Sequence, residues 1–84
     1  MKEKRKKEIS ETAKNFAQNL KHYRQQLKWD QTTLATASDV SLTYTCEVEN
    51  EQREVSLHVA QKFAKSLKVD LQKMLEQLNN EENS

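Results

Sequence analysis

The chain contains neither glycine nor proline, and this double absence restricts its fold more than any other feature of its 84 residues. Hairpin turns depend mostly on glycine, asparagine or aspartate at positive φ, and loop-rich folds use both missing residues heavily. A chain this short has room for one small domain with a single hydrophobic core. Hydrophobic residues make up 35% of it and recur at helical spacing, which is typical of a folded chain. The sequence therefore predicts one compact all-α domain.

The longest predicted helix covers residues 9–27, where apolar residues recur every three or four positions. Its apolar stripe consists of Ile9, Ala13, Phe16, Ala17, Leu20, Tyr23 and Leu27. Ser56 and Asp70 are expected to cap two helices nearer the C-terminus. The stripes of these two helices consist of Leu57, Ala60, Phe63, Ala64 and Leu67, and of Leu71, Met74, Leu75 and Leu78. With the two short helices described next, the chain has five.

Residues 30–50 have the spacing of two short helices joined by a tight turn. Asp30 can cap the first, which runs to about residue 38, and Ser41 can cap the second. In the second helix, the residues at core-facing spacing are Tyr44, Thr45 and Val48. The residues expected to face outward are Leu42, Thr43, Cys46 and Glu47.

The stretch "FAQNLKHYRQQLKWDQTTLATASDVSLTYTCEVENEQREVSLHVAQKFAKSLKVDLQKML" resembles the helix-turn-helix domain of the phage repressor and Cro (XRE-type) family without insertion or deletion. The positions that match the family pattern are Gln31, Leu34, Ala35, Val40, Ser41, Tyr44, Val48, Glu49, Ser56, Leu57, Phe63, Ala64, Leu67, Val69 and Leu71. Each residue is common, but their fixed spacing over 60 positions makes the resemblance specific. It implies a five-helix repressor-like domain in which the second and third helices form the motif.

The resemblance also implies roles for individual residues. The DNA-contacting positions would be Gln31, Ser41, Leu42, Thr43, Cys46 and Glu47. Arg24 and Glu49 match the positions of a buried structural ion pair in the family. Four positions where the family commonly has glycine hold Lys28, Asp39, Glu51 and Lys68 instead. Those turns are therefore either rebuilt or less stable, since a left-handed lysine or glutamate is unfavourable by roughly 1–2 kcal/mol.

Charge is sorted along the chain although its net value is only +1. Residues 1–28 carry nine lysines and arginines against three glutamates, whereas residues 29–61 carry Arg53 against six acids. No lysine or arginine lies within residues 31–50. Because duplex affinity depends on neutralised phosphates, the contacts must come from elsewhere, with Lys4, Arg5, Lys21 and Lys28 as the candidates. We expect a basic arm over residues 1–8, the domain over 9–78 and a polar tail over 79–84, although the arm could also be only a solubilising tail.

Several functional classes are not expected. The start lacks the apolar core of a secretory signal, and no apolar run is long enough for a membrane span, so we expect a cytoplasmic protein. The lone Cys46 shares no metal-ligand spacing with either histidine, and we expect no metal or cofactor. No glycine loop, metal cluster or nucleophile–base pair points to an enzyme.

Two functions remain. The first is a transcriptional regulator that reads double-stranded DNA through the major groove with residues 41–50 as a homodimer. The alternative is a domain that keeps this fold but binds a protein partner, for example as an antitoxin, through the acidic face of the same helix.

Overall fold

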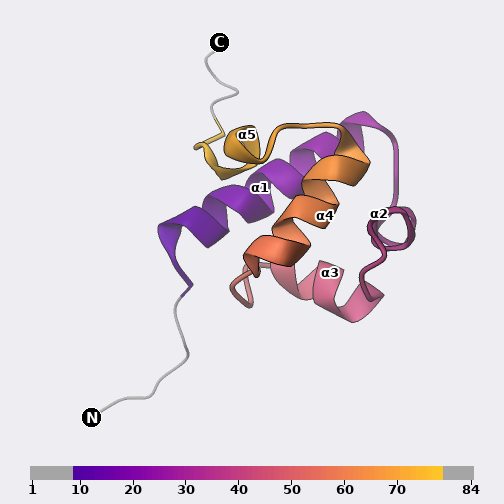
Figure 1. The fold of residues 1–84 in the computed structure, drawn as a ribbon. Coiled ribbons are helices and arrows are strands. Elements are labelled where there is room, and N and C mark those ends of the chain that lie inside the picture. The colour runs from indigo at the N-terminus through magenta and orange to yellow at the C-terminus, as the bar shows by residue number, and fades with distance from the viewer. Residues whose placement is uncertain (1–8, 79–84) are drawn as a thin grey trace.

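The computed structural model describes residues 9–78, and within that range the chain forms five α-helices and no strand (Figure 1). They are α1 (Glu11–Gln26), α2 (Gln31–Ser38), α3 (Leu42–Glu49), α4 (Leu57–Leu67) and α5 (Leu71–Leu75). The predicted all-α, five-helix fold is confirmed. The expected basic arm (1–8) and polar tail (79–84) lie outside the described residues.

Side-chain caps fix where most of these helices begin. Asp30, Ser41 and Ser56 each accept a hydrogen bond from the backbone N–H three residues further on, as the sequence predicts. Ser10 caps α1 in the same way, although apolar spacing alone did not predict this cap. Asp70 occupies the N-cap position of α5, as the sequence predicts, but its side chain makes no capping hydrogen bond.

The core draws on every helix. Its buried members are Phe16, Leu20, Leu34, Val48, Ala60, Phe63, Ala64, Leu67 and Met74. The rings of Phe16 in α1 and Phe63 in α4 lie 6.1 Å apart. Figure 1 shows α4 crossing α1. The remaining helices pack around this crossing, with α5 against α1 and α2 against α3 and α4.

Three leucines assigned to buried stripes are exposed instead. They are Leu57 (67% exposed), Leu27 (45%) and Leu75 (36%). Leu57 is the first residue of α4, Leu75 is the last of α5, and Leu27 follows the last residue of α1. A helical stripe extends beyond the core at a helix end, so its terminal members are only partly covered by other side chains.

The four positions that hold glycine in the family keep a left-handed backbone here. Lys28, Asp39, Glu51 and Lys68 have φ values of 63°, 58°, 59° and 61°. The turns are therefore retained and not rebuilt. Asp39 and Lys68 end α2 and α4, where a left-handed residue lets backbone N–H groups reach the last helical carbonyls.

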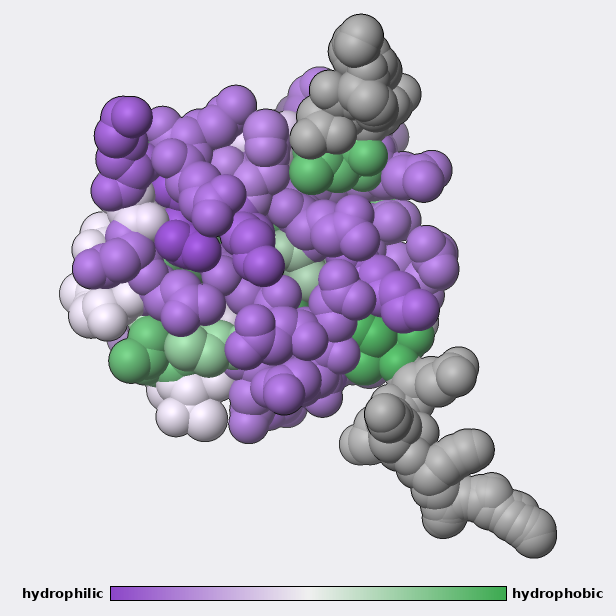
Figure 2. All heavy atoms as spheres, turned by 180° about the vertical axis from the view of Figure 1, so that it is seen from behind, coloured by the Kyte–Doolittle hydropathy of each residue, from purple (hydrophilic) through white to green (hydrophobic). Residues whose placement is uncertain are grey.

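The surface seen from behind is mostly hydrophilic, with small separate apolar areas (Figure 2). Among residues 9–78, none of the helices has both the length and the apolar character to cross a membrane.

Candidate nucleic-acid interface

Helices α2 and α3 form a tight helix-turn-helix. α2 ends at Ser38, Asp39 takes the left-handed conformation, and Ser41 caps α3 with an Oγ–N distance of 3.1 Å to Tyr44. The N–H of Val40 donates to the carbonyl of Ala35 at 3.0 Å. Three residues therefore connect the two helices, and backbone hydrogen bonds fix this turn onto the end of α2.

One face of α3 is buried and the opposite one is open. Thr45, Val48 and Glu49 are buried, and the Thr45 hydroxyl donates to the carbonyl of Ser41 at 2.9 Å. Ser41, Leu42 and Thr43 are exposed at the start of the helix. The inner face thus anchors α3, and its N-terminal turn is available to a ligand.

The ion pair that the resemblance implies between Arg24 and Glu49 is present. Arg24 Nε donates to Glu49 Oε2 at 2.6 Å, and Arg24 Nη2 donates to Oε1 at 3.0 Å. Arg24 Nη1 also donates to the carbonyl of Trp29 at 2.8 Å. The Glu49 side chain is fully buried, so this acid presents little negative field to a polyanion. Through these bonds, the Arg24–Glu49 pair joins α1, the turn after α1 and the end of α3.

Gln31 and Cys46, both candidates for DNA contact, belong to the same network. Gln31 Nε2 donates to Glu49 Oε1 at 2.9 Å. The Oε1 atom of Gln31 accepts from Cys46 Sγ at 3.1 Å. Both side chains are half-buried, so Cys46 is not the fully outward residue that the sequence predicts. The amide of Gln31 is therefore held on both sides by the protein itself.

Glu47 lies in a second cluster, with a residue that the sequence pattern did not assign to the site. Arg53 Nη1 is 3.2 Å from Glu47 Oε1, and the Arg53 guanidinium carbon lies 4.1 Å from the centre of the Tyr44 ring. The Tyr44 hydroxyl accepts from the N–H of Ser56 at 3.1 Å. No helical spacing relates Arg53 to Glu47, because a turn separates them. The only sequence signal was a single cation in an acidic segment.

The structure places two of the four basic candidates, and both lie outside α2 and α3. Lys21 and Lys28 are exposed on α1 and in the turn after it, whereas Lys4 and Arg5 lie outside the described residues. The root of the arm is nevertheless placed, because Ser10 donates to Glu54 through its N–H at 2.6 Å and through its hydroxyl at 3.0 Å. The start of α1 therefore lies beside the α3–α4 turn (Figure 1).

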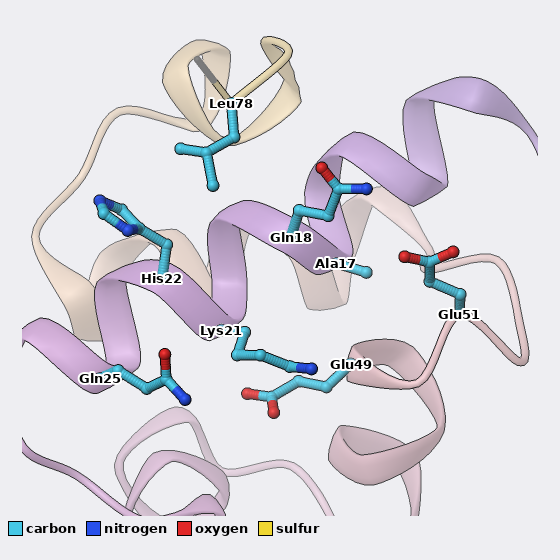
Figure 3. Close-up of a pocket in the computed structure, with 8 residues that line it drawn as sticks. All are labelled: Ala17, Gln18, Lys21, His22, Gln25, Glu49, Glu51 and Leu78. Atoms are coloured by element: carbon cyan, nitrogen blue, oxygen red, sulfur yellow. The ribbon is translucent and has the colours of Figure 1, made fainter. Parts of the chain in front are cut away.

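A hollow of about 370 Å³ lies along α1. Figure 3 shows Lys21 and Gln25 leaving α1 on the side where Glu49 lies, and Leu78 reaching toward α1 from the opposite side. Small-molecule sites are mostly lined by apolar side chains, whereas most side chains here are polar or charged, so this hollow lacks the lining typical of such a site.

Within residues 9–78, no three histidine, cysteine or acidic side chains group closely enough to hold a metal ion.

Comparisons with known proteins agree with this geometry. A family model described as helix-turn-helix matches residues 20–74. The restriction-modification controller protein C.AhdI from Aeromonas hydrophila is 32% identical over 74% of this chain and 94% of its own, with a TM-score of 0.70. A search of curated proteins gave no match.

Two further structures share the fold at 23% identity. A hypothetical transcription factor, NHTF from Neisseria, covers 92% of this chain and 91% of its own, with a TM-score of 0.78. The restriction-modification controller protein C.Esp1396I covers 80% and 90%, with a TM-score of 0.72.

Proposed function

This chain belongs to the XRE-type helix-turn-helix family of DNA-binding transcription regulators, and we propose that it recognises a specific duplex site by placing α3 in the major groove. One observation carries this proposal. Helix α3 is anchored by Thr45, Val48 and Glu49 on its inner face, while Leu42 and Thr43 are exposed at its start. Because α3 is held in this way, its exposed N-terminal turn has a fixed position from which its side chains can contact base edges.

The outward side chains of α3 have groups that suit base contacts. Leu42 and the methyl group of Thr43 can contact thymine methyls, and Glu47 can accept from the N4 amino group of cytosine. Ser41 and Cys46 complete the same side of α3. The amide of Gln31 is already bonded to Cys46 and Glu49, so we expect Gln31 to meet a phosphate through its backbone N–H at the start of α2.

Phosphate neutralisation comes from outside the motif in this proposal. Residues 31–50 contain no lysine or arginine, so Lys4, Arg5, Lys21 and Lys28 supply the positive charge. The bonds between Ser10 and Glu54 support this, because they hold the root of the basic arm beside the turn that follows α3.

The active species we propose is a cytoplasmic homodimer. Regulators of this type bind two half-sites about one helical turn apart, so a twofold-symmetric protein matches a palindromic site. Sedimentation of the protein with and without a two-half-site duplex tests this arrangement. We expect two chains per duplex, and one chain per duplex would contradict the dimer.

Selection of bound duplexes from a random pool tests the main proposal. We expect one enriched sequence, and we expect Thr43→Ala to weaken binding to that sequence more than to a scrambled duplex. Lys65→Gln, a change on α4, is the matched control and should leave the preference unchanged. If no sequence is enriched and random duplex is not bound even at low salt, the alternative function, binding of a protein partner, is favoured.

A further inference from the structure

Glu47 and Arg53 are held as a pair at the C-terminal end of α3. Arg53 Nη1 donates to Glu47 Oε1 at 3.2 Å, and Arg53 Nε donates to the carbonyl of Glu54 at 3.3 Å. Arg53 Nη2 and Glu47 Oε2 make no hydrogen bond to any residue between 9 and 78. The side chains of Arg53 and Glu47 are 44% and 40% exposed, so a ligand can reach the remaining donor and acceptor together.

Tyr44 keeps this pair in place. The guanidinium lies 4.1 Å from the centre of the Tyr44 ring, and the ring's hydroxyl is tied to the N–H of Ser56 at the start of α4. An aromatic ring attracts a cation over its face, and arginine stacks there with its fork of donors still available. The guanidinium therefore has a fixed orientation although it lies at the surface.

A lone Glu47 would approach duplex DNA against like-charge repulsion. Pairing with Arg53 cancels that charge and leaves one carboxylate oxygen as an acceptor beside free guanidinium donors. This combination is complementary to a single base pair. In the major groove, cytosine presents an N4 donor, and the guanine paired with it presents the O6 and N7 acceptors.

We propose that Glu47 and Arg53 act as one unit that reads a C·G base pair, with Glu47 accepting from cytosine N4 and Arg53 donating to guanine. The inference rests on the proposed function, since it requires α3 to enter the major groove. Arg53 becomes a specificity-determining residue, and Tyr44 becomes a positioning residue for it.

The test compares Glu47→Gln, Arg53→Gln and the double variant on duplexes that differ at one base pair of the selected site. Wild type should prefer C·G at one position per half-site by roughly tenfold or more, the range expected of a good base contact. Either single change should abolish most of that preference. The double variant should lose no more than either single one, because partners in one contact are not additive.

Three controls separate this role from a structural one. Thermal unfolding should be nearly unchanged in all three variants, since exposed ion pairs contribute little to stability. Glu51→Gln and Lys65→Gln remove exposed charges of the same two signs outside the pair and should keep the C·G preference. Arg53→Lys keeps the charge but loses the planar fork, so it should lose the preference as well.

Different failures have different meanings. If Arg53→Gln keeps the C·G preference and lowers the salt slope of log affinity by about 0.9, Arg53 contacts a phosphate and the inference is overturned. Retention of the preference in Arg53→Lys would overturn it too. Wild type that binds a selected site with no C·G preference overturns this inference alone, whereas wild type that binds no DNA overturns the proposed function with it.

Discussion

Left-handed backbone at lysine and glutamate is a residue-scale source of instability in this fold. Lys28, Glu51 and Lys68 have φ near 60°, where a side chain crowds the following carbonyl. Asp39 shares the conformation but tolerates it better, because a short polar side chain can bond locally. Three turns are therefore held in place by the packing of the helices that they join.

Glycine at these positions should stabilise the protein. Lys68→Gly should raise the free energy of unfolding by about 1 kcal/mol, since relief of the left-handed strain outweighs the extra entropy of the unfolded chain. Lys65→Gly, three residues earlier within α4, is the matched control and should lower it by about 0.5–1 kcal/mol. Urea unfolding measures both changes, and a fall for Lys68→Gly would show that this turn carries no strain.

The buried Arg24–Glu49 pair leads to a second residue-scale prediction. Arg24→Met leaves the fully buried Glu49 carboxylate without its cation, which should lower the free energy of unfolding by about 3–5 kcal/mol. Arg24→Met with Glu49→Leu should lower it by less than Arg24→Met alone, because no unpaired charge is left behind. Denaturant unfolding of the two variants decides this. A double variant that is less stable than the single one would assign the stability to the hydrogen bond that Gln31 donates to Glu49, which only the double variant loses.

At the scale of single elements, α5 depends on α1 for its existence. A five-residue helix is not stable alone, and its last carbonyls need partners. The buried Asn19 of α1 donates to the carbonyls of Met74 at 2.9 Å and Glu76 at 2.7 Å. Asn15, one turn earlier, makes a longer bond of 3.3 Å to Leu75.

Removal of the Asn19 amide should therefore release α5. Asn19→Leu should lower the free energy of unfolding by about 1–3 kcal/mol, since the buried carbonyl of Met74 and the partly buried carbonyl of Glu76 lose their donor. Hydrogen exchange should accelerate at residues 71–76 before it does so in α4. Asn15→Leu is the matched change and should have a smaller effect; equal effects of the two variants would count against a special role for Asn19.

The cap of α2 gives the stability a pH dependence. The backbone N–H of Thr33 donates to the Asp30 carboxylate and lowers the pKa of that group below its ordinary value. A lowered folded-state pKa means that the stabilisation is present above the ordinary pKa and is lost as the pH falls through the folded value. Asp30→Asn should therefore lose less stability than wild type between about pH 5 and pH 2, measured by urea unfolding. Parallel curves for the two proteins would contradict this.

The elements that the sequence predicts best are those with both a cap and a periodic stripe. Asp30, Ser41 and Ser56 mark true helix starts, and the core positions of α1 and α4 follow helical spacing. Helical spacing cannot show where an apolar stripe extends beyond the core, which is why the exposed Leu57 was wrongly assigned to a buried stripe. It also cannot relate residues across a turn, so the contacts of Arg53 with Glu47 and of Asn19 with α5 needed the fold.

At the scale of the whole molecule, the sorting of charge assigns attraction to duplex DNA and recognition of its base sequence to different parts of the chain. The acidic motif would choose the sequence, while the basic N-terminal part would supply attraction to any duplex. Phosphate contacts position a protein without specifying bases. The two contributions can therefore be removed separately.

Deletion of residues 1–8 should weaken binding to selected and scrambled duplexes alike. Removal of each phosphate contact should reduce the slope of log affinity against log salt by about 0.9, while base preference survives. Affinities of the full and shortened chains at several salt concentrations measure this. Identical slopes would show that the arm is only a solubilising tail, and Lys21 and Lys28 would then be the remaining source of phosphate contacts.

The bonds from Ser10 to Glu54 fix the point at which residues 1–8 join the fold. Eight residues can span at most roughly 26–29 Å when fully extended. Duplex DNA rises about 3.4 Å per base pair, so residues 1–8 can reach no more than about eight base pairs from Ser10. DNA beyond that reach should therefore gain no further phosphate contact from residues 1–8, and the place of Ser10 in the fold sets where that limit lies along each half-site.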